Sequence, residues 1–266
     1  MRELVFVGLG LNDDKGISLQ GLEEIKTAET VFIELYTSLL PEFLMERFVR
    51  TSGKKPRSIG RKELEDENGR IILAAAKKGK TVLLAPGDPL IATTHVTLRM
   101  EAAKQRIPAR IVHGASILSA VIGLSGLHNY KFGKTVTIPF PDAVPSQTPY
   151  EVIAQNKKLG LHTLCLLDIN AQEKRCLTIE EGLESLLEIE KKKKRKVVTA
   201  KTVAVGIARA GSRNPTVKAD FVERLRRVDF GNPPHSIVFP GKLHFTEAEA
   251  LIMLAGGPAK TREMTE

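Results

Sequence analysis

Alternation of strand-like and helix-like segments is the sequence feature that most constrains the fold of this chain. In the first 113 residues, short apolar runs predict strands and apolar residues at helical spacing predict helices between them. The predicted strands are 4–7, 31–35, 81–85 and 109–113, and the predicted helices begin near residue 18 and cover 69–78 and 94–105. Strands joined through helical crossovers pair in parallel, which predicts a parallel sheet covered by helices.

After residue 113 the alternation becomes less regular. The predicted strands there are 134–139, 162–168, 203–208 and 236–239, and the predicted helices are 116–124, 150–159, one opened by Thr178 and one opened by a Thr246–Glu249 capping box. A chain of 266 residues is long for one domain and suits two. We therefore expect an α/β protein with one α/β domain at residues 1–112 and a second, with a more mixed sheet, at 113–266.

The sequence indicates a cytoplasmic protein. Two cysteines, Cys165 and Cys176, cannot form a disulfide framework, and we expect both to be buried or unreactive thiols. The apolar stretch at 4–11 is too short for a signal peptide. The longest uncharged run, 115–127, is shorter than the roughly 18 residues of a membrane span, so no membrane association is predicted.

The formal net charge of +9 could indicate a nucleic-acid-binding protein. The positive charge is concentrated in one short run, however, and does not indicate a basic binding surface. Residues 191–196 (KKKKRK) alone supply +6 of it. This run follows a predicted acidic helix, where cations at the C-terminal end are favoured by the helix dipole. A solvated helix end is the simpler interpretation, and contact with RNA or an acidic protein stays open.

A glycine-rich turn, GLGLND at residues 8–13, follows the first predicted strand. Asp13 stands where the third glycine of a dinucleotide-binding fingerprint is needed, and Asp13 and Asp14 would repel a pyrophosphate. A nicotinamide or flavin enzyme is therefore disfavoured. The turn either lets the backbone approach another ligand or has a structural role.

The segment APGDPL at 85–90 directly follows another predicted strand. Its two prolines stiffen the backbone and project Asp88 from the carboxyl end of the strand, where ligands bind in open α/β sheets. Asp88 could accept hydrogen bonds from ribose hydroxyls or hold an ammonium group; alternatively, it caps a helix. Loops at 113–116, 168, 208–212 and 231–235 follow or precede other predicted strands.

No common hydrolase, NTPase or metal-site motif is present. None of the six histidines is spaced with another ligand as a metal site requires, so we predict no metal. GxSxG and Walker loops are also missing from the sequence.

Several of these segments together resemble the diphthine synthase family, which belongs to the wider group of tetrapyrrole methylases. The matching segments are GLGL at 8–11, FIELYTSL at 32–39, PGDPLIATTH at 86–95, YKFGK at 130–134, GLHTL at 160–164, ARAGS at 208–212 and PPH at 233–235. The resemblance is colinear over nearly the whole chain. PGDP alone indicates only the wider group, whereas its combination with ARAGS and PPH is specific.

The resemblance implies a homodimeric methyltransferase that uses S-adenosyl-L-methionine, releases S-adenosyl-L-homocysteine and holds its cofactor in the cleft between two α/β domains. Its protein substrate would be translation elongation factor 2. The reaction, a step of diphthamide biosynthesis, would trimethylate the amino group of a 3-amino-3-carboxypropyl-histidine and give diphthine. No nucleic acid is required.

Carried over residue by residue, the resemblance implies eight cofactor contacts and assigns no catalytic residue. These contacts are Leu11, Asp88, Ile91, Ser116, Ile117, Leu167, Ala210 and His235. The apolar members would flank the adenine and Asp88 would meet polar groups of the cofactor.

Methyl transfer requires mainly that the nucleophile be aligned with the methyl group and that water be excluded, because the sulfonium of the cofactor carries its own leaving group. The substrate amine must lose a proton before it attacks, and either water or His235 would accept this proton. Two other functions stay open: methylation of a corrin-type tetrapyrrole, and a non-catalytic RNA- or ribosome-binding module that uses residues 191–196.

Overall fold

The computed structural model describes residues 2–141, 146–170, 173 and 175–265. The chain folds into two compact units, the first reaching Ile117 and the second comprising most of the chain from Leu118 on. The predicted division between residues 112 and 113 stays a prediction. Among the described helices, none is long and apolar enough to cross a membrane.

The first unit contains a five-stranded sheet in the order β3-β2-β4-β1-β5, with every neighbouring pair parallel. Its strands are β1 (Glu3–Gly8), β2 (Thr30–Glu34), β3 (Arg57–Ile59), β4 (Lys80–Ala85) and β5 (Ala109–Val112). Its helices are α1 (Leu19–Thr27), α2 (Met45–Ser52), α3 (Arg70–Ala76) and α4 (Val96–Lys104), with a 3₁₀ turn at Asp14–Gly16 and a π-helical turn at Lys62–Asp66. The parallel sheet predicted from the alternation is confirmed. Strand β3 and helix α2 were not anticipated.

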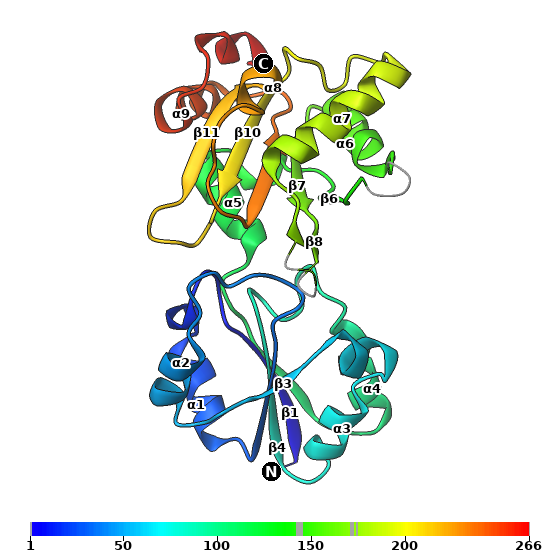
Figure 1. Cartoon of the computed structure of the whole chain (residues 1–266), viewed down its shortest axis with the longest axis vertical. Coiled ribbons are helices and arrows are strands. Elements are labelled where there is room, and N and C mark those ends of the chain that lie inside the picture. The colour runs from blue at the N-terminus through cyan, green and yellow to red at the C-terminus, as the bar shows by residue number, and fades with distance from the viewer. Residues whose placement is uncertain (1, 142–145, 171–172, 174, 266) are drawn as a thin grey trace. The chain divides into compact units, whose positions relative to one another are not determined.

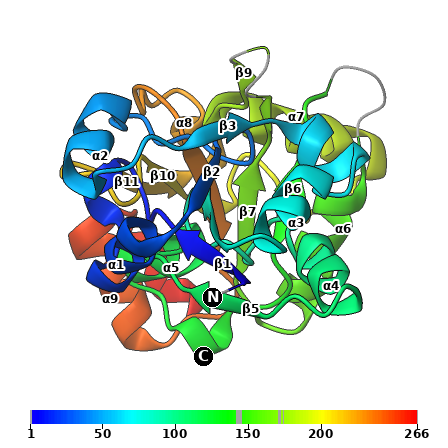
Figure 2. The ribbon, with the colours of Figure 1, turned by 90° about the horizontal axis from the view of Figure 1, so that it is seen from below.

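Both faces of this sheet are covered, which accounts for the continuous apolar runs in its strands. Val5 and Val7 of β1 pack with Ile25 of α1 and Phe48 of α2. Alternate residues of the same strand face the other layer, where Phe6 packs with helices α3 and α4. Figures 1 and 2 show α1 and α2 on one side of the strands and α3 and α4 on the other.

The second unit contains a mixed five-stranded sheet in the order β11-β10-β12-β7-β6. Only the β6–β7 pair is parallel; the other three are antiparallel. The strands are β6 (Val136–Ile138), β7 (Thr163–Leu167), β10 (Val203–Ala208), β11 (Thr216–Phe221) and β12 (His235–Phe239), with a small hairpin of β8 (Ile169–Asn170) and β9 (Arg175–Cys176). The predicted mixed sheet is confirmed, whereas β11 was missed.

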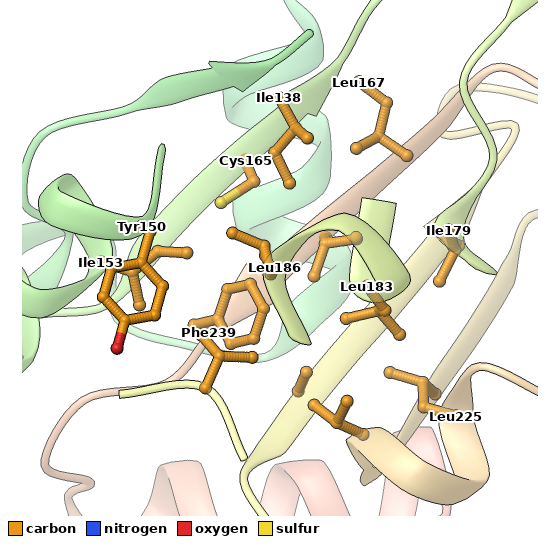
Figure 3. Packing of buried hydrophobic residues seen from close by; sticks show 14 of the residues in the cluster. Ile138, Tyr150, Ile153, Cys165, Leu167, Ile179, Leu183, Leu186, Leu225 and Phe239 are labelled. Carbon is orange, nitrogen blue, oxygen red and sulfur yellow. The ribbon is translucent and has the colours of Figure 1, made fainter. Parts of the chain in front are cut away.

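Helices α6 and α7 cover one face of this second sheet. The helices of the chain from residue 117 on are α5 (Ile117–Ser125), α6 (Thr148–Lys158), α7 (Ile179–Lys193), α8 (Val222–Leu225) and α9 (Phe245–Ala255), with 3₁₀ turns at Asn129–Lys131 and Ala259–Met264. Figure 3 shows Tyr150 of α6 and Leu186 of α7 packed with Cys165 of β7. Cys165 is buried as predicted, whereas Cys176 is only half-buried.

The start of the last helix differs from the prediction. Thr178 opens α7 with a capping box, as expected, but α9 begins at Phe245 and its N-cap is His244. The capping box is formed by His244 and Glu247, so the predicted Thr246–Glu249 box is wrong. The reason is tertiary, because the Glu247 carboxylate is buried and holds groups from two other segments, 128–131 and His162, as well as the helix start.

Glu247 is fully buried and its carboxylate accepts four hydrogen-bond donors or cations. The backbone N–H groups of His128 and His244 each donate to it at 2.7 Å, and the His162 Nε2–H donates at 3.0 Å. The Lys131 ammonium lies 3.2 Å away. His162 is neutral in this arrangement, because its Nδ1 accepts from the backbone N–H of Gly241 at 2.9 Å. Burial opposes ionisation of Glu247, yet these donors lower its pKa to about 2.

We expect Glu247→Gln to lower the free energy of unfolding at pH 7 by about 3 kcal/mol, since it removes one partner from a buried charged network. The folded-state pKa of Glu247 lies below its ordinary value of 4.5, so this stabilisation is present above about pH 4.5 and is lost as the pH falls toward about 2. Urea unfolding of wild type and variant at pH 7 and at pH 4 measures the difference, which should shrink in acid. The control is Glu249→Gln on the same helix, where a solvent-exposed ion pair with Arg262 contributes little to stability. Equal effects of the two variants would contradict this account.

Candidate functional site

Three neighbouring strands of the first sheet end at the same edge, and five of the predicted site residues follow them. Strand β1 lies between β4 and β5, and all three run in the same direction. The loops that follow them contain Leu11, Asp88 with Ile91, and Ser116, and the last of these loops leads into α5 at Ile117. The carboxyl edge of a parallel sheet is where α/β proteins bind ligands, and the structure brings these five residues to that edge.

The three loops approach one another so closely that glycine is required. Gly10 and Gly87 exchange backbone hydrogen bonds of 3.1 and 2.7 Å, and both have positive φ angles. A Cβ atom at Gly8 would lie 2.5 Å from the carbonyl oxygen of Gly87 and 2.6 Å from the backbone nitrogen of Gly114. The glycines of residues 8–13 are thus explained by contact between loops, which favours the structural interpretation of that turn.

Asp88 is almost completely buried and has a different partner for each carboxylate oxygen. Oδ1 accepts the backbone N–H of Leu90 at 3.0 Å, which closes a turn inside the loop. Oδ2 lies 2.7 Å from Nδ1 of His113, and the His113 side chain is 73% exposed. Helix α4 begins only at Val96, so the alternative that Asp88 caps a helix is wrong.

The neighbouring predicted residues are accessible on this edge. Ile91 is 42% exposed, and Leu11, Ser116 and Ile117 are partly exposed. An exposed isoleucine beside a buried carboxylate offers one apolar and one charged contact. This arrangement suits a ligand that has both an apolar ring and hydroxyl or ammonium groups.

A buried histidine, His95, contacts the loop that carries Asp88. His95 is 1% exposed, and its Nδ1–H donates to the carbonyl oxygen of Pro89 at 2.9 Å. Its Nε2 faces Oε1 of Glu34 at 3.7 Å and has no hydrogen-bond partner among the described residues. Glu34 is fully buried at the end of β2, and burial raises the pKa of this carboxyl although His95 opposes the effect. The pair connects β2 to the loop that carries Asp88.

Glu34 also organises the loop that follows its own strand. Its carboxylate accepts the backbone N–H groups of Tyr36 and Thr37, each at 3.1 Å, and the Thr37 hydroxyl at 2.5 Å. The Tyr36 hydroxyl and the Thr94 hydroxyl both donate to Glu65, at 3.1 and 3.0 Å. The segments FIELYTSL and PGDPLIATTH are therefore joined by the buried Glu34–His95 pair and by the half-buried Glu65.

The second unit gathers the other three predicted residues at one edge of its sheet. Leu167 ends β7, Ala210 follows β10 and His235 begins β12. Because β12 is antiparallel to both neighbours, its first residue lies beside their last ones: His235 pairs with Ala208 and Ser236 with Leu166. All three predicted residues are at most 7% exposed.

Arg209 fastens the two glycine-containing loops of this edge together. Its guanidinium donates to the carbonyl oxygens of Phe230 at 2.6 Å and Asn232 at 2.8 Å, and to the Thr216 hydroxyl at 2.7 Å. Its backbone N–H donates to the carbonyl oxygen of Pro234 at 2.8 Å. Arg209 thus joins the ARAGS and PPH segments through its side chain and its backbone N–H.

Two buried polar atoms on these loops lack hydrogen-bond partners among the described residues. His235 Nε2–H donates to the carbonyl oxygen of Gly231 at 3.1 Å, so the neutral ring presents Nδ1 as an acceptor, and Nδ1 is unpaired. Burial lowers the pKa of His235, which keeps it neutral near pH 7. The Ser212 hydroxyl is the second unpaired group. Buried polar atoms of this kind are normally satisfied, and a ligand would satisfy them.

Several residues of these edges were not predicted as functional. Glu34, His95, Arg209 and Ser212 all lie inside the family-like segments, but spacing alone does not show that they are buried and face other loops. His113 was noted only as the end of a strand. Glu34, His95, Arg209 and His113 are each recognised by a contact with a residue distant in the sequence, and Ser212 is recognised by its unpaired hydroxyl.

The basic run at 191–196 is partly neutralised inside the second unit. Lys193 and Arg195 both form ion pairs with Glu151 at 2.8 Å. Lys194 ends α7 in the left-handed conformation that closes a helix. This agrees with the helix-end interpretation of the run.

Comparisons with known proteins agree with the resemblance seen in the sequence. The model of the tetrapyrrole (corrin/porphyrin) methylases matches residues 3–225. A diphthine synthase of Methanosarcina acetivorans is 48% identical, with 99% of this chain and 100% of the relative covered. A diphthine synthase of Methanocorpusculum labreanum is 46% identical, with 95% and 99% covered.

Solved structures give the same result. A crystal structure of a diphthine synthase has a TM-score of 0.90 at 41% identity and covers 98% of this chain and 99% of its own. A putative diphthine synthase from Entamoeba histolytica has a TM-score of 0.85 at 34% identity, with 94% and 97% covered. The chain therefore belongs to the tetrapyrrole (corrin/porphyrin) methylase family and, within it, to the diphthine synthases.

Proposed function

We propose that this protein methylates translation elongation factor 2 with S-adenosyl-L-methionine, as a step of diphthamide biosynthesis. Similarity to diphthine synthases over 99% of the chain is the observation that carries the proposal. The acceptor is the amino group of a 3-amino-3-carboxypropyl-histidine, and three transfers give the trimethylammonio product, diphthine. A corrin-type tetrapyrrole substrate and an RNA-binding module are not favoured by this similarity.

The cofactor contacts that we propose in the first unit fit an S-adenosyl group. The Asp88 carboxylate is paired through Oδ2 with His113. Because the His113 side chain is largely exposed, polar groups of a ligand can approach this pair from solvent. Ile91 and Ile117 supply apolar surface, and Leu11 and Ser116 belong to the loops that the glycine contacts hold together. When bound, S-adenosyl-L-methionine supplies an electrophilic methyl group together with its leaving group.

In the second unit, Leu167, Ala210 and His235 complete the proposed set. The unpaired Nδ1 of neutral His235 is an acceptor, which suits a hydroxyl or exocyclic amino group of a nucleoside. We therefore assign His235 to cofactor binding. Because burial lowers its pKa, His235 is a weak base, and we assign removal of the substrate proton to water.

Two further properties belong to the proposal. The protein acts as a homodimer, and it acts in the cytoplasm, where elongation factor 2 works. Its residues bind, orient and exclude water, and none of the described side chains needs to react covalently, because methyl transfer depends mainly on alignment.

The first test is an intact-mass assay with S-adenosyl-L-methionine and elongation factor 2 that carries the aminocarboxypropyl-histidine. We expect addition of three methyl groups to the modified factor and none to the unmodified control. A fourth methyl would indicate an ester as well. Transfer to neither factor, with S-adenosyl-L-homocysteine still bound, would refute the proposed substrate.

We expect Asp88→Asn to weaken binding of S-adenosyl-L-homocysteine roughly tenfold to hundredfold, the usual effect of losing a hydrogen bond to a charged group. The asparagine Oδ1 can still accept from the Leu90 N–H, so thermal stability should change little. Titration calorimetry measures the affinity, and Glu23→Gln, an exposed carboxylate on α1, is the matched control. Unchanged affinity in Asp88→Asn would remove this residue from the site.

A pair of substitutions separates the two contacts of His95. In His95→Asn the amide nitrogen can occupy the Nδ1 position and donate to Pro89, whereas His95→Gln places its amide near Glu34 and loses the contact to Pro89. We expect S-adenosyl-L-homocysteine affinity within about twofold of wild type in His95→Asn and roughly tenfold weaker in His95→Gln. Thermal unfolding records the stability of both variants. Equal affinities would show that the Pro89 contact does not position the Asp88 loop.

A further inference from the structure

A cavity of about 440 Å³ lies in the second unit, apart from all eight predicted cofactor residues. It is lined by the first or last residues of four strands, Thr163 of β7, Val203 of β10, Phe221 of β11 and Phe239 of β12. Leu167, Ala210 and His235 lie at or beyond the opposite ends of β7, β10 and β12. The two edges are separated by the length of β10, about 16 Å.

The cavity combines an apolar floor with an excess of positive charge. Its apolar lining includes Ile153, Leu161, Val203, Phe221, Phe239 and Met264. Its charged lining consists of Lys157, Lys196, Lys201, Lys260 and Glu263. Glu263 is the only acidic group of this lining, and it lies 3.8 Å from Lys260. Among the described residues, no carboxylate lies within 4 Å of the ammonium groups of the other three lysines.

The ammonium group of Lys157 illustrates the excess of positive charge in this lining. Its Nζ donates to the carbonyl oxygens of Lys196 at 3.2 Å and Val197 at 3.1 Å, two other residues of the lining. Burial lowers the pKa of Lys157, and Glu190 only partly opposes this. A bound anion would compensate the charge that the described neighbours leave without a counter-ion.

The floor and rim together define a class of ligand. Pockets for small molecules have volumes of about 300–1,000 Å³, an apolar lining and a few polar groups that orient the ligand. Lysine ammonium groups act as point charges for carboxylate and phosphate. We propose that this cavity is a second binding site, for a small organic anion that carries one carboxylate or phosphate on an apolar body.

The proposal also gives a role to one residue of the basic run. Lys193 and Arg195 form ion pairs with Glu151, whereas Lys196 lines the cavity and its backbone N–H donates to Glu190 at 2.7 Å. The run thus contains two cations that pair with Glu151 and one, Lys196, that borders the cavity.

The test uses 8-anilinonaphthalene-1-sulfonate as a fluorescent amphipathic anion and N-phenyl-1-naphthylamine as its uncharged counterpart. Both are titrated into wild-type protein saturated with S-adenosyl-L-homocysteine. We expect saturable binding of the sulfonate at one site and markedly weaker binding of the amine. Equal affinities for the two dyes, or loss of sulfonate binding once S-adenosyl-L-homocysteine is present, would overturn the proposal.

Matched lysine variants locate the binding. We expect Lys157→Met and Lys201→Met each to weaken sulfonate binding roughly tenfold, as for a lost charged contact. Lys158→Met is the control, because Lys158 is the next residue on α6, is exposed like Lys157 and does not line the cavity. Lys201 is exposed, so its variant stays informative if Lys157→Met fails to fold. Equal affinity in the Lys201 and Lys158 variants refutes the site.

Competition identifies the head group. Octanoate and octyl phosphate are each used to displace the bound sulfonate from wild-type protein. Displacement by octanoate alone assigns a carboxylate ligand, and displacement by octyl phosphate alone assigns a phosphate. Failure of both to displace the dye would overturn the proposed class of ligand.

Discussion

Backbone-to-backbone contact among three loops is the constraint on which the first unit depends. The chain segments at the ends of β1, β4 and β5 touch through Gly8, Gly87 and Gly114. A Cβ atom at Gly8 or Gly114 would lie less than 3 Å from backbone atoms of the other segments, and Gly87 has a positive φ angle. This contact is possible only because the three strands are neighbours and run in parallel, so that their carboxyl ends coincide. It brings Asp88 beside His113 and sets five predicted contacts along one edge. The glycines are therefore explained by packing, and the residues that they position are the cofactor contacts proposed above.

Buried polar groups then hold these loops in place. His95 and Glu34 support the Asp88 loop, Arg209 joins the ARAGS and PPH loops, and Glu247 fixes the start of α9. Each group is far in sequence from at least one of its partners. A methyl transfer that depends on alignment requires such rigid loops more than it requires an acid or a base. The carboxylate–histidine pair of the family-like segments, Glu34 with His95, is buried and supports the Asp88 loop.

The second sheet presents different chemistry at its two edges. One edge carries His235 and Ser212 with unpaired polar atoms, and the other carries a cavity with an apolar floor and four lysines. Antiparallel pairing places His235, the first residue of β12, beside Ala208 at the end of β10. The last residue of β12, Phe239, lies beside Thr163 at the start of β7, where the cavity is. A single short sheet can therefore serve two ligands of different charge without overlap.

The sequence by itself determined the strand and helix alternation, the parallel first sheet and the mixed second one, because apolar periodicity and turn residues are local signals. It also determined the family, since PGDPLIATTH, ARAGS and PPH are contiguous segments. Only the tertiary structure decided that α9 starts at His244 and not at Thr246, because the deciding group, Glu247, is held by segments more than 80 residues away. The same holds for the roles of His95, Arg209 and the lysine-lined cavity. A buried polar contact or a cavity exists only between segments distant in the sequence, and no local pattern encodes that proximity.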